Sequence, residues 1–527
     1  MLLLVALSVA SASARPLFDS PWNPFPVRGG APLQHLVTAH GAVGDNATMN
    51  TAPINAAFDA CARSGGGYVV VPGPGVFLTG QVRLRSGCYL LLQPGAALQA
   101  TTDDAIGEYG ADSDFWALVV GVGVANTGVI APALPRGSAP GAAGGELVGT
   151  MWQSIASYDS ATNSFTKQPP GSDIGLLLVQ DGANLTVAGV TLRDSGFWAQ
   201  TFRRCAHVRE ERVHVKGSVQ WGTADGADVE SGFNLTFADS VFKTGDDCLA
   251  FRSGSFEQLH VPWPAGPVAP VQRVRLSNLT LTSSSSAIKL EASTVSNRTD
   301  VGDIFDVLID GVTIIDSNRG IGIWQRSGER RNSPAVAGRG AIRDVLIRNV
   351  VIRTRFDSKP QFWGSGEPFV LTVAPRNGDC CVGVQNVTLE NVVAEAENSA
   401  LVSSLGSPLG GSPLPPPVRG VRLVNVSITI GRFGNATRPQ RDYRPVSAGM
   451  PGVGEGGTVP ALVDGVVVEN IEDLVIGGGG GVTFSSAPRA HPPYWGMACI
   501  NASGPSPVHF ADRAHWLCRN VSAAWRR

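Results

Sequence analysis

The sequence predicts an all-β chain that folds as a right-handed parallel β-helix, a solenoid of stacked strand coils, with a short N-terminal capping helix. The main observation is a recurring unit in which an apolar alternation is followed by Asn or Asp and then by a second apolar alternation. Period-two alternation is typical of strands, and its repetition along the chain is typical of a solenoid. Copies of the unit begin at residues 184, 234, 274, 307, 345, 387, 421 and 466. A β-propeller is the alternative, but the chain has no Trp-Asp or blade-length signature.

The composition fits a globular chain that is rich in turns. Hydrophobic residues make up 43% of the 527 residues, and the chain holds 64 Gly and 36 Pro. Charged residues are 16%, against the usual share of about a quarter. The net charge of −2 provides no basic field that could hold nucleic acid or anionic lipid nonspecifically. We therefore expect no nucleic-acid partner, and we exclude a disordered or coiled-coil chain.

The first residues predict a signal peptide at 1–14. Residues 2–12 form a short apolar run, and a small-x-small cleavage pattern ends at Ala14, although the basic start that signal peptides usually carry is missing. A buried N-terminal strand or helix is the alternative. We expect residues 15–527 to form one β-helix domain without a membrane span, because no run of 18 apolar residues occurs.

The cysteines and the glycosylation motifs favour export through the eukaryotic secretory pathway to the extracellular space or cell wall. The chain has eight Cys and ten Asn-x-Ser/Thr sequons. Because the Cys spacing fits no zinc-site pattern, disulfides are the better interpretation. The pairs that we expect are Cys61–Cys88, Cys205–Cys248 and Cys499–Cys518, with Cys380 and Cys381 unassigned.

The predicted domain has three parts: a cap at about 36–67, coils at about 68–475 and a tail at 476–527. In the cap, Asn50 precedes an early Pro and gives a polar helix N-cap. An apolar stripe at helical spacing follows, and a Gly triplet ends the helix at residues 65–67. The stripe consists of Ile54, Ala57, Phe58 and Cys61. Gly/Pro-rich stretches at 130–145, 405–418 and 438–459 are expected to be loops, because the strand unit resumes after each.

Three acidic residues are the candidate catalytic group. Asp225 lies about one coil before the pair Asp246 and Asp247, and residues one coil apart stack at roughly 4.8 Å. Carboxylates that converge in this way repel one another, which raises the pKa of at least one. An acid and a base side by side are what glycosidic hydrolysis requires. The alternative is that these Asp residues only form turns.

At these residues the chain resembles glycoside hydrolase family 28, the polygalacturonase-like pectin hydrolases of the pectate-lyase-like β-helix superfamily. The family pattern Asn-Thr-Asp-Gly…Gly-Asp-Asp-Cys-x-x-x-x-Ser-Gly matches Thr223–Gly226 and Gly245–Gly254. The resemblance implies an inverting hydrolase of galacturonate-containing pectic polysaccharide. It also implies that Asp246 is the general acid and that Asp225 and Asp247 activate water.

The chain departs from the family pattern where the family binds the galacturonate carboxylate. Family members carry Gly-His-Gly and Gly-Ile-Arg-Ile-Lys, whereas this chain has residues 285–291 without His and residues 320–326 without either cation in register. Lys289 alternates with apolar residues and so faces away from the core. The candidate substrate-binding residues are Lys289, Arg326, Gln325, Trp324 and Trp198. For Arg326 a solvated strand face is an equally good interpretation, and Trp198 could instead fill the core.

Two other functions remain open. One is a polysaccharide lyase that works by β-elimination and binds Ca²⁺ through Asp pairs. The other is a non-catalytic, carbohydrate-binding or cell-wall β-helix, which the missing His, Arg and Lys favour and the intact Asp set opposes. For the hydrolase we expect no metal or cofactor, a pectic polysaccharide as the partner, and a monomer.

Overall fold

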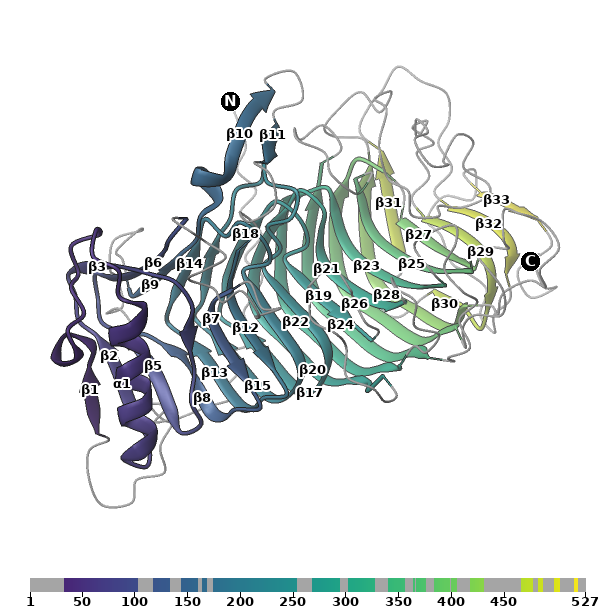
Figure 1. Cartoon of the computed structure of the whole chain (residues 1–527). Helices are drawn as coiled ribbons and strands as arrows, with labels where there is room; N and C mark the ends of the chain where they lie inside the picture. The colour runs from purple at the N-terminus through teal and green to yellow at the C-terminus, as the bar shows by residue number, and fades with distance from the viewer. Residues whose placement is uncertain are drawn as a thin grey trace.

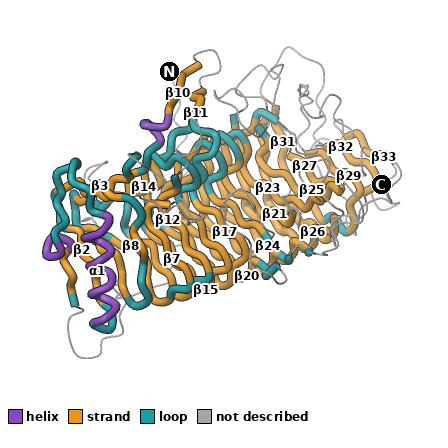
Figure 2. The backbone as a smooth tube through the Cα atoms, viewed as in Figure 1, coloured by secondary structure: helices purple, strands orange, loops and turns teal. Residues whose placement is uncertain are grey.

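The predicted fold class is confirmed by a computed structural model (Figure 1), a parallel β-helix with one α-helix near the N-terminal end of the part that the structure describes. Figure 2 shows the coils following one another along a single axis. The structure describes residues 33–102, 117–132, 144–159, 164–167, 174–253, 268–293, 302–327, 340–355, 364, 366–375, 383–398, 400–404, 418–430, 466–476, 482–486, 497–502 and 516–519. The proposed signal peptide and the Gly/Pro-rich stretch at 438–459 lie outside these ranges. Within the described part, no helix is long and apolar enough to cross a membrane.

The strands form three parallel stacks, one on each face of the solenoid. The first stack contains β1 (Gln34–Leu36), β2 (Gly67–Val71), β5 (Cys88–Leu92), β8 (Ala125–Ile130), β13 (Ala183–Ala188) and β30 (Val475–Ile476). The second contains β3 (Gly75–Thr79), β6 (Ala96–Ala100), β9 (Glu146–Val148), β14 (Thr191–Arg193), β16 (His214–Lys216), β18 (Val241–Thr244) and β31 (Val482–Ser486).

The third stack carries the candidate site and is called the site face below. It contains β4 (Val82–Arg83), β7 (Ala117–Val122), β12 (Gly175–Gln180), β19 (Leu249–Arg252), β21 (Ser286–Ser293), β23 (Arg319–Ser327), β25 (Glu367–Pro375), β27 (Ala400–Ser404), β29 (Val466–Glu472), β32 (Met497–Ala502) and β33 (Trp516–Arg519). Strands therefore continue into residues 476–527, where we expected a tail.

Seven longer strands turn a corner and belong to two stacks. β15 (Gln200–Glu211) and β17 (Ala227–Ala238) run from the site face into the first stack. The strands that join the first and second stacks are β20 (Val271–Ser283), β22 (Ile304–Ser317), β24 (Ala341–Thr354), β26 (Gly383–Ala396) and β28 (Val418–Ile430). Outside the solenoid, β10 (Ile155–Asp159) and β11 (Ser164–Lys167) form an antiparallel ribbon after the short 3₁₀ helix η2 (Met151–Ser154).

The Asn and Asp residues of the repeat form these corners. Many of them have a positive φ, a conformation that Asn and Asp adopt more readily than other non-Gly residues. Asn side chains of successive coils also bond to one another: Nδ2 of Asn391 donates to Oδ1 of Asn349, and Nδ2 of Asn425 donates to Oδ1 of Asn391 at 2.8 Å. These ladders turn the chain and keep neighbouring coils in register.

The corners also explain half of the glycosylation motifs. Five of the ten sequons coincide with corner residues that have positive φ. They are Asn184, Asn234, Asn278, Asn386 and Asn425. A corner Asn followed by an apolar residue and then by Thr or Ser is part of the strand repeat itself. These sequons therefore have a structural origin, and their number is weaker support for export than the sequence suggested.

The N-terminal helix caps the core as predicted. The helix α1 (Thr51–Arg63) follows the 3₁₀ helix η1 (Val37–His40) and buries all four residues of the apolar stripe. Asn50 makes no side-chain cap. Its Nδ2 instead donates to the carbonyls of Val43, Thr48 and Leu78, which fixes the loop before the helix against β3.

The disulfide predictions have different outcomes. Cys61–Cys88 is confirmed and joins α1 to β5. The Cys205–Cys248 prediction is wrong, because both are buried free thiols. Cys205 comes just after the site-face segment of its coil, whereas Cys248 comes just before the site-face segment of a later coil. The two thiols therefore lie at opposite edges of this face. Cys499 and Cys518 are backbone register partners in β32 and β33, and their disulfide stays a prediction. Cys380 and Cys381 lie outside the described residues.

One acidic side chain lies inside the apolar core. Glu210 of β15 is fully buried, and its register partners are the core residues Val187 and Phe237. Burial raises its pKa from 4.5 to about 8 because the charged form loses its hydration. The folded protein therefore keeps this carboxyl protonated at pH values where the unfolded chain has lost the proton.

This difference predicts that stability depends on pH. Unfolding releases the proton of Glu210 between pH 4.5 and about 8, so the free energy of unfolding falls as pH rises through this window, by up to about 1.4 kcal/mol per pH unit. Thermal unfolding from pH 5 to 8 should show a falling Tm, with a shallower slope in Glu210→Gln. The exposed control Glu472→Gln should keep the wild-type slope. Equal slopes in all three proteins would contradict this account.

Candidate active site

The three Asp residues predicted from the sequence lie together on the site face. One oxygen of each of Asp225, Asp246 and Asp247 lies within 4.8 Å of the others. Asp225 and Asp247 are each 2% exposed, whereas Asp246 is partly exposed. The predicted stacking of neighbouring coils is visible in the backbone, where the amide of Gly226 donates to the carbonyl of Asp247 at 2.9 Å.

Glycines next to the Asp residues allow this close approach. A Cβ at Gly226 would lie 2.3 Å from the carbonyl oxygen of Cys248, and one at Gly245 would lie 1.9 Å from that of Trp221. Any other residue at these positions would push the two coils apart. Trp221 is buried, and its Nε1 donates to the carbonyl of Gly196 at 2.8 Å, which anchors the turn that leads to Asp225.

Hydroxyl groups fix the Asp246–Asp247 turn. The hydroxyls of Thr244 and Ser283 each donate to the carbonyl of Asp246 at 2.6 Å. Oδ1 of Asp247 accepts from Oγ of Ser285 at 2.9 Å and from the amide of Ser286 at 3.0 Å. Hydrogen bonds from donors favour the ionised form of a carboxylate, so Asp247 is well placed to act as a base.

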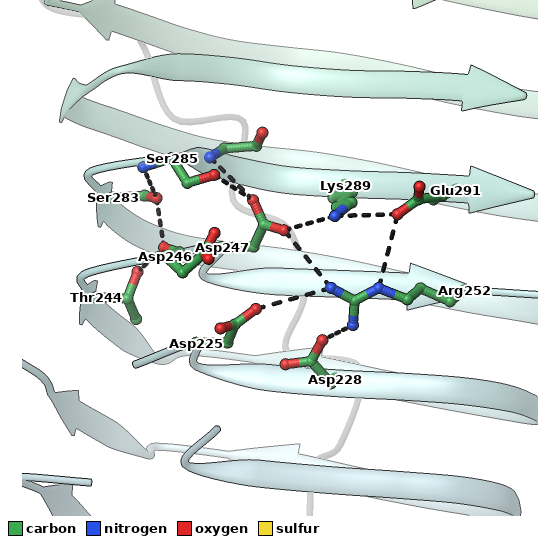
Figure 3. A network of polar contacts seen from close by, with 11 residues as sticks. Asp225, Asp228, Thr244, Asp246, Asp247, Arg252, Ser283, Ser285, Lys289 and Glu291 are labelled. Atoms are coloured by element: carbon green, nitrogen blue, oxygen red, sulfur yellow. Dashed lines mark hydrogen bonds and ion pairs between the residues drawn. The ribbon is translucent and has the colours of Figure 1, made fainter. Parts of the chain in front are cut away.

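Two cations lie against the Asp cluster (Figure 3). Nζ of Lys289 is 3.1 Å from Oδ2 of Asp247 and 3.0 Å from Oε2 of Glu291. The guanidinium of Arg252 lies 3.8 Å from both Asp225 and Asp247. It also contacts Asp228, and it lies 3.7 Å from Glu291. Arg252 therefore links four carboxylates from three consecutive coils.

Arg252, Asp228 and Glu291 were missed as site residues. Arg252 is one coil from both Glu230 and Glu291, and all three occupy the same register row of the site face. The sequence held a partial signal, because Arg252 follows the apolar Phe251, although Ser253 comes after it where Lys289 has a second apolar neighbour. Its meaning depends on the register, which shows that opposite charges meet across neighbouring coils.

The predicted substrate-binding residues have different locations. Lys289 lies outside the apolar core and faces the Asp cluster. Trp198 is 4% exposed and its ring lies 4.9 Å from the guanidinium carbon of Arg252, which supports packing rather than sugar stacking. Trp324 is also 4% exposed, with its ring 5.5 Å from Nζ of Lys289. Little ring surface is therefore open to a sugar at either Trp.

Gln325 is not placed to contact substrate. Its register partner Ala292 belongs to the core, its Nε2 donates to the carbonyl of Gly340, and its Oε1 accepts from the amide of Gly383 at 2.8 Å. The amide thus joins segments of the backbone. Arg326 pairs in register with Ser293 and Ala374, and its side chain lies outside the part of the chain that the structure describes.

The electrostatics of the cluster favour retention of a proton. Burial raises the pKa of Asp225 well above its ordinary value of 3.8, and the charges of Asp246 and Asp247 raise it further, whereas Arg252 and Lys289 lower it. The cluster can therefore hold one protonated and one ionised carboxyl at the same time, which is the condition for acid–base catalysis. Three oxygens this close could also contact a cation, although Ca²⁺ takes six to eight oxygen ligands, and the charges of Lys289 and Arg252 oppose one here.

Comparison with known proteins identifies the class. The sequence model of the family described as "Glycosyl hydrolases family 28" matches residues 69–355. The chain therefore belongs to this family of glycoside hydrolases. A probable polygalacturonase of Vitis vinifera is 24% identical over 406 residues, which cover 74% of this chain and 72% of that protein.

Two solved structures share the fold. The family 28 exopolygalacturonase of Yersinia enterocolitica superposes with a TM-score of 0.55 at 15% identity, over 93% of this chain and 77% of that chain. The polygalacturonase of Erwinia carotovora ssp. carotovora gives a TM-score of 0.53 at 17% identity, over 78% and 98% respectively. At these identities the superpositions show the fold alone.

The contacts of Lys289 predict the direction of a pH effect. In Lys289→Gln the pKa of Asp225 should rise further, because one of the two cations that lower it is removed. The pH profile of kcat/KM should therefore move to higher pH. The control Arg419→Gln removes an exposed cation that pairs with Glu472 in a remote coil, and it should leave the profile in place. A shift to lower pH in Lys289→Gln would contradict the assigned contacts.

Proposed function

We propose that this glycoside hydrolase cleaves a galacturonate-containing, pectic polysaccharide by acid–base catalysis on the Asp cluster. The observation that carries the proposal is the clustering of Asp225, Asp246 and Asp247 within 4.8 Å of one another. The pectic substrate is supported by the family and by relatives whose names include polygalacturonase. The bound polymer supplies a glycosidic oxygen that must be protonated and an anomeric carbon that water must attack.

The roles follow from exposure and contacts. Asp246 is the partly exposed member of the three, so we assign it as the general acid that protonates the leaving oxygen. Asp247 is held by Ser285, Ser286 and Lys289, and we assign it with Asp225 to the activation of water. Because the raised pKa of Asp225 keeps a proton in the cluster, transfer within the cluster can reprotonate Asp246 after each turnover.

We propose that the reaction inverts the anomeric configuration. One oxygen of each Asp lies within 4.8 Å of one oxygen of the other two, which is closer than the roughly 6.5–9.5 Å between the two carboxyl groups of most inverting glycosidases. The presence of a third carboxyl distinguishes this site from that two-carboxylate arrangement. One group can donate the proton while two hold the water, so no carboxylate has to act as a nucleophile.

Lys289 has a positioning role in this proposal. Its ammonium lies between Asp247 and Glu291, so it stabilises the ionised form of Asp247. We propose that it also contacts a hydroxyl of the sugar bound there, and its position beside Asp247 supports this role. The burial of Trp198 supports a different role, in which its ring orients Arg252.

We also propose that the chain is exported. The Cys61–Cys88 disulfide supports this, because structural disulfides form mainly in oxidising compartments. The apolar run of residues 2–12 followed by a cleavage pattern supports it as well. Export would bring the enzyme to wall polysaccharides outside the cell.

The test of this function is the release of reducing ends from pectic polymers. Asp246→Asn should lose about 10²- to 10⁴-fold of the activity, because removing a general acid typically costs that much. A chelator should have no effect on the wild-type rate. The control Asp306→Asn changes an exposed partner of Arg275 on the first stack and should keep wild-type activity. Activity that a chelator abolishes, with an unsaturated product, would instead indicate a calcium-dependent lyase.

A further inference from the structure

Among the described residues, the Asp cluster has an excess of negative charge. Around Asp247 the described residues bring together five carboxylates and two cationic side chains. The carboxylates are Asp225, Asp228, Asp246, Asp247 and Glu291, and the cations are Arg252 and Lys289. With every group ionised, the excess is three negative charges, and one retained proton leaves two. Buried ion pairs nearby, such as Arg203 with Glu230 at 2.7 Å, are neutral overall and do not change this balance.

Both cations are already engaged by carboxylates. Lys289 has one carboxylate oxygen at 3.1 Å and another at 3.0 Å. Arg252 contacts four carboxylates and packs on Trp198. The side chains of both are less than 10% exposed. A carboxylate on the substrate would have to compete with these partners. Within the described part of the cluster, Arg252 and Lys289 are the two cations that it could reach.

The next coil places an indole ring beside Lys289, with the ring of Trp324 5.5 Å from Nζ. The register partner of Lys289 in β23 is Gly322, and the ring of Trp324 covers it so closely that a Cβ at Gly322 would lie 1.8 Å from the ring. No cationic side chain fits there while Trp324 keeps its place. On the same ring lies the guanidinium of Arg319, 5.3 Å from the centroid, which pairs with Glu367 at 3.3 Å.

We infer that the sugar unit bound at the Asp cluster carries no free carboxylate. This inference rests on the proposed pectic function and specifies the substrate class further. A free galacturonate would place another negative charge against an already negative, poorly hydrated site, where like charges repel strongly. An uncharged sugar avoids this repulsion. Two such units occur in pectic chains: the methyl ester of galacturonate and a neutral sugar such as rhamnose.

Three polymers distinguish these sources when kcat/KM is measured on each. They are fully de-esterified polygalacturonate, highly methyl-esterified homogalacturonan and a rhamnogalacturonan backbone. At least one of the last two should exceed the first by more than about tenfold. If the enzyme prefers the esterified polymer and loses this preference after the polymer is saponified, the unit bound at the cluster is the methyl ester. If the enzyme prefers rhamnogalacturonan, the unit is the neutral sugar. De-esterified polygalacturonate as the best substrate would overturn the inference, whereas no cleavage of any of the three would overturn the proposed function itself.

A charge variant tests the cause of the selectivity. Glu291→Gln removes one negative charge and frees a donor on both Lys289 and Arg252. The variant should raise the ratio of kcat/KM on polygalacturonate to kcat/KM on the uncharged substrate at least severalfold. The matched control Glu395→Gln, which changes a partly exposed partner of Arg353 on another face, should leave the ratio unchanged. An unchanged ratio in a folded Glu291→Gln protein would contradict the electrostatic explanation.

The salt dependence of the wild-type protein gives a readout that needs no variant. Screening weakens repulsion between the site and an anionic polymer, so the rate on polygalacturonate should rise between about 10 and 150 mM NaCl, while the rate on a neutral substrate should change little. A rate on polygalacturonate that falls with salt would mean that the site attracts the anion, and it would overturn the inference.

Discussion

The lateral register of the coils is the constraint on which the rest of this structure depends. In a parallel β-helix each side chain has its neighbours one coil before and one coil after, at about the strand spacing of 4.7–4.9 Å. The corner residues with positive φ hold this register, and their Asn side chains bond from coil to coil. A slip of one residue in any coil would turn its core residues outward and take its site residues out of the cluster.

The active site is a direct product of this register. Asp225 and Asp247 come from consecutive coils, and Lys289 and Glu291 from the coil after them. Because Arg252 lies between Asp228 and Glu291, the site face carries a buried network in which cations separate carboxylates. A buried ionic network is weak support for stability, since desolvation offsets much of the Coulomb attraction. The contribution of the network is electrostatic, because it holds several carboxylates close together, and the charges of Asp246 and Asp247 add to the burial that raises the pKa of Asp225.

Much of the fold was predictable because it rests on local patterns. Period-two alternation predicted the strands, and the helical stripe of Ile54, Ala57, Phe58 and Cys61 predicted α1. The Gly-Asp-Asp sequence predicted where the Asp residues would cluster. The failures share a physical cause, which is that they depend on register and direction across coils. Cys205 and Cys248 have a suitable sequence spacing but lie at opposite edges of the site face.

The same limitation applies to the substrate-binding residues. Gln325 was expected to bind substrate, yet its position beside Ala292 directs it into the solenoid. Arg252 was missed although it contacts more carboxylates of the cluster than Lys289 does. The ion-pair partner of a charged residue in an alternating strand can be identified only when the register of the neighbouring coil is known.

The most direct test of the central claim, water attack catalysed by the Asp cluster, is digestion of a cleavable pectic polymer in ¹⁸O-labelled water. The first products would be analysed by mass spectrometry and by ¹H NMR of the new reducing end. We expect one ¹⁸O atom at each new anomeric carbon, with inverted configuration in the first product. Unsaturated products without label would contradict hydrolysis, and labelled products of retained configuration would contradict the assignment of two carboxyls to water.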